Sequence, residues 1–148
     1  MKGSPEAIAK ACADALWQND KTSQSLGMQI ERVAPGVAEL SMTVTETMAN
    51  GHGSCHGGYL FTLADSTFAF ACNTYNQNCV AQHCNISYLA PVFAGEKLTA
   101  TGTEVSRTGR NGIYDIRITN QKQKTVVEFR GYSRTIRGTL LPEEQTSE

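Results

Sequence analysis

The sequence predicts an α+β fold in which an antiparallel β-sheet wraps around one long central helix, with a short N-terminal helix before it. Residues 54 to 75 have a helical period with apolar side chains on nearly every side, and a helix that is apolar all round is buried all round. The expected order of helix, two strands, long helix and four strands lacks the strand–helix alternation of a parallel sheet. We therefore expect one domain over residues 1–148, with disordered ends at 1–3 and 141–148.

The individual elements follow from local signals. Ser4-Pro5-Glu6 marks a helix start, because a capping hydroxyl precedes a proline and an acid in the first turn. This helix should end near Asn19. A tight turn at Pro35-Gly36 joins the first two expected strands, and a loop at 47–53 precedes the long helix. The expected strands cover residues 28–34, 37–45, 80–89, 97–106, 112–119 and 125–136.

Composition and charge exclude several classes of function. The formal net charge of −1 gives no footprint for nucleic acid or an anionic membrane. The N-terminus lacks a signal-type apolar run, and Asp65, Ser66 and Asn73 make the long helix a poor membrane span. The 5 cysteines are irregularly spaced without a CxxC pair, which indicates reduced thiols and a cytoplasmic protein.

Asp65 is the only residue with a formal charge between Glu46 and Glu96, if histidine is counted as neutral. A lone carboxylate in an apolar segment is costly to bury unless it is paired, hydrogen-bonded or takes part in chemistry. A structural role would bond it to a hydroxyl such as that of Ser66 or Thr67. Its isolation from charge partners favours a general base or a nucleophile.

A glycine-rich loop opens the long helix, with Gly57-Gly58 at the helix start. It has neither P-loop nor GxGxxG spacing, so it is either a flexible turn or a place where bare backbone N–H groups meet a ligand. The helix dipole favours negative charge there, as an oxyanion requires. Gly57 and Asp65 are eight positions apart, about 12 Å along a helix. The two groups would therefore act together only between antiparallel copies in a two-fold dimer.

Three other sites compete with this interpretation. His52, Cys55 and His56, with His83-Cys84, suggest zinc, but the ligand pairs of structural zinc are missing and we predict no metal. Cys55 before a helix start would have a lowered thiol pKa and could be a nucleophile with a histidine as its base, which leaves Asp65 unexplained. The turn from Arg107 to Gly112 is either solvated or an anion-binding turn.

The motifs resemble those of hotdog-fold acyl-CoA thioesterases, most closely the phenylacetic-acid-degradation branch. The matching pattern is Asn50, then His56-Gly57-Gly58, then Leu63-Ala64-Asp65, and it extends over most of the chain through four further segments: Met42-Thr43-Val44-Thr45, Phe93-Ala94-Gly95, Gly112 to Ile116 and Phe129-Arg130-Gly131.

The resemblance implies a hotdog fold that forms a homodimer with shared active sites, usually paired again into a tetramer. Such enzymes hydrolyse aromatic acyl-CoA thioesters, of phenylacetyl or hydroxyphenylacetyl type, to the free acid and CoA without a metal or other cofactor. By position, the Gly57 N–H would polarise the thioester carbonyl, and Asp65 of the facing chain would activate water or attack directly. Asn50 would position the water or thioester, and His56 would orient the loop or bond the carbonyl region.

The CoA contacts implied by the resemblance are Gly58, Arg107, Arg110, Asn111, Ser133 and Arg134. Two alternatives stay open. A hydratase-like hotdog enzyme usually needs an aspartate and a histidine close together, and no histidine follows Asp65 within the next turns. A non-catalytic acyl-CoA binder would have no need to retain Asn50, Gly57 and Asp65 together.

Overall fold

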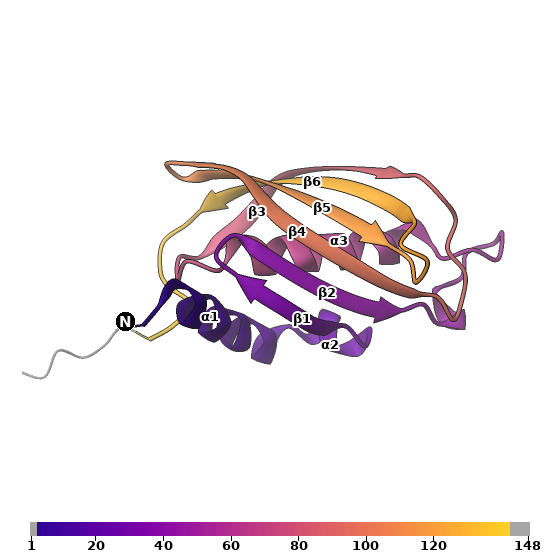
Figure 1. The fold of residues 1–148 in the computed structure, drawn as a ribbon, viewed down its shortest axis with the longest axis horizontal. Coiled ribbons are helices and arrows are strands. Elements are labelled where there is room, and N and C mark those ends of the chain that lie inside the picture. Colours follow the sequence, from indigo (N-terminus) through magenta and orange to yellow (C-terminus); the bar gives the residue numbers. More distant parts are fainter. Residues whose placement is uncertain (1–2, 143–148) are drawn as a thin grey trace, which may run out of the picture.

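The computed structural model describes residues 3–142, in which a six-stranded antiparallel sheet curves around helix α3 (Figure 1). The strand order is β1-β2-β4-β5-β6-β3. The predicted α+β architecture is confirmed. The elements in chain order are α1 (Pro5–Asn19), α2 (Lys21–Ser25), β1 (Gln29–Ala34), β2 (Val37–Thr43), a 3-10 turn (Glu46–Met48), α3 (Gly57–Cys72), β3 (Cys79–Tyr88), β4 (Lys97–Thr108), β5 (Asn111–Thr119) and β6 (Thr125–Thr135).

Several element boundaries differ from the prediction by one to three residues. At two helices a side chain that starts or ends the helix explains the difference. The short helix α2 was not predicted; its cap is the Asp20 carboxylate, which accepts the Ser23 N–H at 3.0 Å. The central helix ends at Cys72 and not near Tyr75. The Asn73 amide donates to the Ala69 carbonyl at 2.9 Å and accepts the Cys79 N–H at 2.9 Å, and so turns the chain into β3.

The expected terminal disorder falls largely on residues 1–2 and 143–148, outside the described part of the chain. At the described C-terminal end, the Leu141 N–H donates to Asn76 Oδ1 at 2.9 Å. Within residues 3–142 no helix has the length and apolarity to cross a bilayer.

The core lies between α3 and the concave face of the sheet. Phe68 packs against Tyr114 and Phe129 with ring centroids 5.8 and 6.1 Å apart. Gly131 on β6 makes this approach possible, because a Cβ there would lie 2.7 Å from the Phe68 ring. Burial of this kind, at about 25 cal/mol per Å² of apolar surface, is the main force that holds the helix in the sheet.

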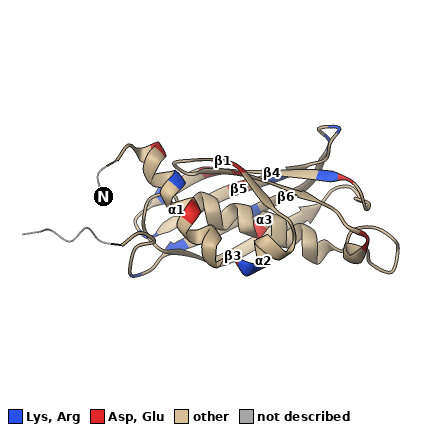
Figure 2. Cartoon of the chain, turned by 90° about the horizontal axis from the view of Figure 1, so that it is seen from below, with Lys and Arg blue, Asp and Glu red and all other residues tan. Residues whose placement is uncertain are grey.

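The apolar pattern of the central helix predicted burial on every side, and the structure differs from that prediction. Gly58, Thr62, Asp65 and Ala69 remain exposed or half-buried, and their spacing of four, three and four residues places them on one face. We call this row the open stripe. Figure 2 views the molecule from the side on which α3 lies in front of the sheet.

The two edges of the sheet differ. Helix α1 packs beside β1, whereas β3 is a ten-residue edge strand whose side chains are mostly exposed. Val80 and Tyr88 on β3 are 45% and 50% exposed. A long, exposed edge strand is a usual place for another chain to pair.

Candidate active site

The loop before α3 is ordered by the side chain of Asn50. Its Oδ1 accepts the backbone N–H groups of His52 and Ser54 at 2.9 and 3.2 Å, and its Nδ2 donates to Ser54 Oγ at 3.0 Å. An amide has two hydrogens on nitrogen, so one remains available to a ligand. The expected role of Asn50 toward water or thioester stays a prediction, and the contacts add a second role in shaping the loop.

The start of α3 leaves one backbone donor without a partner. His56 is the N-cap residue, and its Nδ1 accepts the Gly58 N–H at 2.9 Å. Among residues 3–142 no group accepts the N–H of Gly57. This donor lies at the positive end of the helix dipole, where a developing negative charge is stabilised.

Asp65 lies two turns along the same helix, on the open stripe. Burial raises the pKa of its carboxyl above the ordinary aspartate value, and no neighbouring donor or cation of the described chain opposes the shift. The two hydroxyls considered for a structural role are bonded elsewhere. Ser66 Oγ lies 2.8 Å from Ser23 Oγ, and Thr67 donates to the Leu63 carbonyl at 2.8 Å. The carboxylate is therefore free to meet a group from outside the protomer.

Within one protomer the two groups do not meet. Gly57 is the first residue of α3 and Asp65 is the ninth, so about 12 Å of helix separates them. A single chain consequently does not bring the Gly57 N–H and the Asp65 carboxylate together.

The structure weakens the cysteine-nucleophile alternative. Cys55 is buried, and desolvation raises the pKa of its thiol; the lowered value expected before a helix start is wrong. The Nδ1 of His56 is occupied by the Gly58 N–H, so this atom is not a base for the thiol. Among the described residues no group of three or more His, Cys, Asp or Glu is arranged to hold a metal.

The residues expected to contact CoA lie toward the opposite end of α3, except Gly58. The Arg107 guanidinium stacks on the Tyr75 ring at 3.6 Å from its centroid, just beyond the end of the helix. Asn111 Oδ1 accepts from Gln82 Nε2 at 3.0 Å. Arg110 and Arg134 are exposed, whereas Ser133 is 3% exposed and its hydroxyl faces the Gly112 backbone. A 16-residue helix spans about 24 Å, so one chain does not bring these groups to Gly57.

Two hollows flank the start of α3. One of about 490 Å³ lies between α2 and α3, with Leu26, His56, Gly58, Tyr59 and Thr62 among its lining residues. The other, of about 420 Å³, contains Gly57 and is walled by Leu60, Tyr88, Leu89 and Pro91. Both are large enough for an aromatic acyl group.

Tyr88 and Ser54 were missed by the sequence reasoning. Tyr88 donates its hydroxyl to the Gly57 carbonyl at 3.0 Å across 31 positions of sequence, and no local pattern signals a contact of that range. Ser54 was visible as part of a polar loop, since Asn and Ser side chains commonly bond nearby backbone.

The comparisons with known proteins identify the family of the chain. The model of the thioesterase superfamily matches residues 52–127. The acyl-coenzyme A thioesterase PaaI of Escherichia coli (strain K12) is 49% identical over 131 residues, which cover 88% of this chain and 94% of that protein.

Solved structures of similar proteins give the same result. The structure of the E. coli PaaI protein from the phenylacetic acid degradation operon has a TM-score of 0.90 at 48% identity, and the match covers 92% of this chain and 99% of that one. A mutant of the phenylacetic acid degradation protein PaaI from Thermus thermophilus has a TM-score of 0.74 at 33% identity, with 77% and 97% covered. The chain therefore belongs to the thioesterase superfamily and is a hotdog-fold acyl-CoA thioesterase similar to PaaI.

Proposed function

We propose that the enzyme hydrolyses aromatic acyl-CoA thioesters, of phenylacetyl or hydroxyphenylacetyl type, to the free acid and CoA. The Gly57 N–H of one protomer and Asp65 of the facing protomer would form the site. One observation carries this proposal: α3 presents a backbone donor without an acceptor in the described chain and, on its open stripe, a carboxylate without a partner there. Two groups that each lack a partner in the protomer fit one reaction centre between protomers.

The acyl preference rests on the relatives and on the hollows. The similar E. coli protein is named an acyl-coenzyme A thioesterase and comes from a phenylacetic acid degradation operon. Leu26 and Tyr59 beside Gly58, and Leu60 and Tyr88 beside Gly57, offer apolar surface to an aryl group. These features favour an arylacetyl group over a short polar acyl group.

Two open surfaces of the protomer support the proposed dimer. The open stripe carries small side chains, which permit a second helix to approach closely, and β3 presents a free edge. A two-fold axis that places the two α3 helices antiparallel would bring each Asp65 toward the other chain's Gly57. Two such dimers would then pair into a tetramer.

The same antiparallel arrangement would account for the distribution of the expected CoA contacts. It would bring the end of α3 marked by Arg107 toward the partner's Gly57 end. The cationic side chains of Arg107, Arg110 and Arg134, with Asn111, would then meet the CoA phosphates and adenosine. Gly58 would allow the thioester to lie against bare backbone, and Ser133 would act through its strand and not through its buried hydroxyl.

The chemistry requires Asp65 to be ionised. As general base it would take a proton from water while the water oxygen attacks the thioester carbon. As nucleophile its oxygen would attack that carbon and form a mixed anhydride, which water then hydrolyses. In both routes the carbonyl oxygen gains negative charge at the Gly57 N–H and CoA leaves as thiolate. Asn50 would hold the water or thioester with its free amide hydrogen, and His56 would keep the loop in place through Gly58.

The cysteines bear on the location of the enzyme. All 5 cysteines of the chain are free thiols, and free thiols persist in a reducing compartment. We therefore propose a cytoplasmic enzyme.

A panel of acyl-CoA substrates tests the function. Phenylacetyl-, hydroxyphenylacetyl-, short-chain and long-chain acyl-CoA should be compared by kcat/KM, measured from the loss of thioester absorbance, because a thiol reagent would also react with the free cysteines. We expect the highest kcat/KM for the arylacetyl pair. Saturable binding without turnover would identify a binder, and water addition to an enoyl-CoA without CoA release would identify a hydratase; either result contradicts the proposal.

Mixed dimers test the shared site. Two inactive variants, Asp65→Ala and Gly57→Pro, are co-expressed with different tags, and the doubly tagged dimer is isolated. One of its two sites then has both groups intact, so it should regain about half of the wild-type activity, or about a quarter in an unsorted random mixture. Inactive mixed dimers would show that both groups act within one chain.

A further inference from the structure

Tyr88, the last residue of β3, lies directly over the first residue of α3. Its hydroxyl donates to the Gly57 carbonyl at 3.0 Å. A Cβ on Gly57 would lie 3.1 Å from Tyr88 Cζ and 3.2 Å from both Cε1 and the hydroxyl oxygen. The ring therefore rests on bare backbone that only glycine offers at this position.

The peptide between Gly57 and Gly58 is held at both ends. Its carbonyl accepts from Tyr88, and its N–H donates to His56 Nδ1 at 2.9 Å. The His56 restraint comes from the adjacent residue, whereas the Tyr88 restraint comes from the sheet. Two successive glycines have no side chains of their own to fix the backbone, so the sheet contact ties the helix start to a rigid element.

The donor that the proposed mechanism uses is the neighbouring N–H, that of Gly57. It belongs to the preceding peptide, whose carbonyl, that of His56, accepts the Tyr59 N–H at 3.0 Å. The torsion angles of Gly57 link that peptide to the one that Tyr88 holds, so both restraints together set the direction of the Gly57 N–H. We propose that Tyr88 is a positioning residue, whose hydroxyl holds the Gly57 N–H in the direction that stabilises the oxyanion. This inference rests on the proposed role of Gly57.

The expected effect is on kcat. Removing an oxyanion donor costs about 100- to 1000-fold, and a donor that is present but loosely held should cost less. Tyr88→Phe keeps the ring and removes only the hydroxyl, so we expect kcat to fall about 10-fold, with KM changed less than about 2-fold. Tyr88 also walls the hollow that contains Gly57, so a direct contact with the acyl group has to be distinguished from positioning.

A series of acyl groups makes that distinction. A positioning residue lowers kcat by the same factor for phenylacetyl-, short-chain and long-chain acyl-CoA, because the oxyanion is common to all. A factor that changes with the acyl group would overturn the inference and make Tyr88 a specificity residue. Tyr114→Phe is the matched control, since its hydroxyl also makes a 3.0 Å hydrogen bond, to Glu104 within the fold. It should lower stability and leave kcat unchanged.

A double-mutant cycle tests the route of the effect. If Tyr88 acts through the Gly57 N–H, its hydroxyl has no further effect once that N–H is gone. The kcat of Gly57→Pro with Tyr88→Phe should therefore equal that of Gly57→Pro alone, whereas independent factors would overturn the inference. Failure of the proposed role of Gly57 gives a different result. Gly57→Pro would then be as active as Gly57→Ala, while the wild-type enzyme still hydrolyses the substrate.

Discussion

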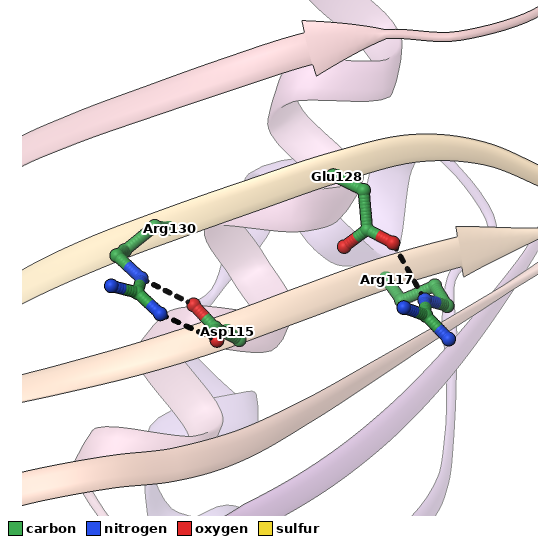
Figure 3. Close-up of polar contacts among 4 residues, drawn as sticks. All are labelled: Asp115, Arg117, Glu128 and Arg130. Carbon is green, nitrogen blue, oxygen red and sulfur yellow. Dashed lines mark hydrogen bonds and ion pairs between the residues drawn. The ribbon is translucent and has the colours of Figure 1, made fainter.

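The pKa of an aspartate is shifted in opposite directions on the outer face of the sheet and on the open stripe of α3. On the sheet, Arg130 donates to both oxygens of Asp115, from Nε at 2.6 Å and from Nη2 at 2.8 Å (Figure 3). Hydrogen bonding from Arg130 lowers the pKa of the Asp115 carboxyl. On α3, burial alone acts on Asp65 and raises its pKa.

The difference follows from what each surface supplies. Strand register places Asp115 opposite Arg130 and Arg117 opposite Glu128, and in both pairs acid and base are bonded (Figure 3). The open stripe supplies no cation, and the Gly57 N–H at its N-terminal end likewise has no acceptor in the described chain. Partnered groups stabilise the fold, whereas groups left without partners are available to a substrate.

The largest expected effect is that of removing the unpaired carboxylate. Asp65→Ala should lower kcat about 100- to 10,000-fold, because no other described carboxylate lies on the open stripe to replace it. Asp115→Ala is the matched control and should keep kcat within about 2-fold, since a surface pair contributes little. Steady-state kinetics with phenylacetyl-CoA measures both. Full activity of Asp65→Ala would show that the unpaired carboxylate takes no part in catalysis.

The next effect concerns the unpaired donor. Gly57→Pro removes the N–H at the first helical position, where proline is otherwise tolerated. Gly57→Ala keeps the N–H and introduces the same Cβ, which meets the Tyr88 ring at 3.1 Å. The loss of kcat in Gly57→Pro relative to Gly57→Ala should be about 100-fold or more. Equal activities would mean that the backbone donor is not used.

The central helix, the number of strands and Asp65 could be predicted from sequence because each has a local signal. A continuous apolar helix, alternating strands and one acid within a long uncharged segment are visible without any tertiary contact. The contacts of Tyr88 with Gly57 and of Asn73 with Cys79 could not be predicted, because they depend on where β3 lies against α3. Helix α2 is too short for its period to show, and the proposed pairing of two chains is beyond any local pattern.

The pH dependence of catalysis should report the raised pKa of Asp65. Both proposed roles need the carboxylate, so kcat/KM should fall as the pH is lowered through a pKa above the ordinary aspartate value of about 3.9. Below that pKa the decline should approach 10-fold per pH unit. The profile is measured at constant ionic strength, with Asp115→Ala giving an unchanged limb. An apparent pKa at or below the ordinary value would place Asp65 in a paired environment like that of Asp115.

The thiols extend the comparison from carboxyls to cysteines. The nearby Cys72 side chain, and the Thr135 hydroxyl 3.4 Å from the Cys79 sulfur, lower the pKa of Cys79 below the ordinary thiol value, whereas desolvation raises that of Cys84. Both residues are half-buried. At pH 7 iodoacetamide should label Cys79 about 10-fold faster than Cys84, and the labelling of Cys79 should slow only when the pH falls below its lowered pKa. Peptide mass spectrometry measures the labelling of both cysteines. Equal rates would contradict a lowered pKa at Cys79.

The smallest effect separates the two aspartates by stability. A carboxyl whose pKa is raised in the folded state holds its proton more tightly there, so its ionisation lowers the stability as pH rises above the unfolded value. Asp65 should therefore destabilise the fold at pH 7, and Asp65→Asn should raise Tm there while it removes activity.

Asp115 has a lowered pKa, so its stabilising effect is present at pH 7 and is lost in acid; Asp115→Asn should lower Tm slightly at pH 7. Thermal unfolding at pH 7 and pH 4 measures both variants, and the difference from wild type should shrink for each at the lower pH. A lower Tm for Asp65→Asn at pH 7 would show that the carboxylate is held by partners after all, and the contrast with Asp115 would be lost.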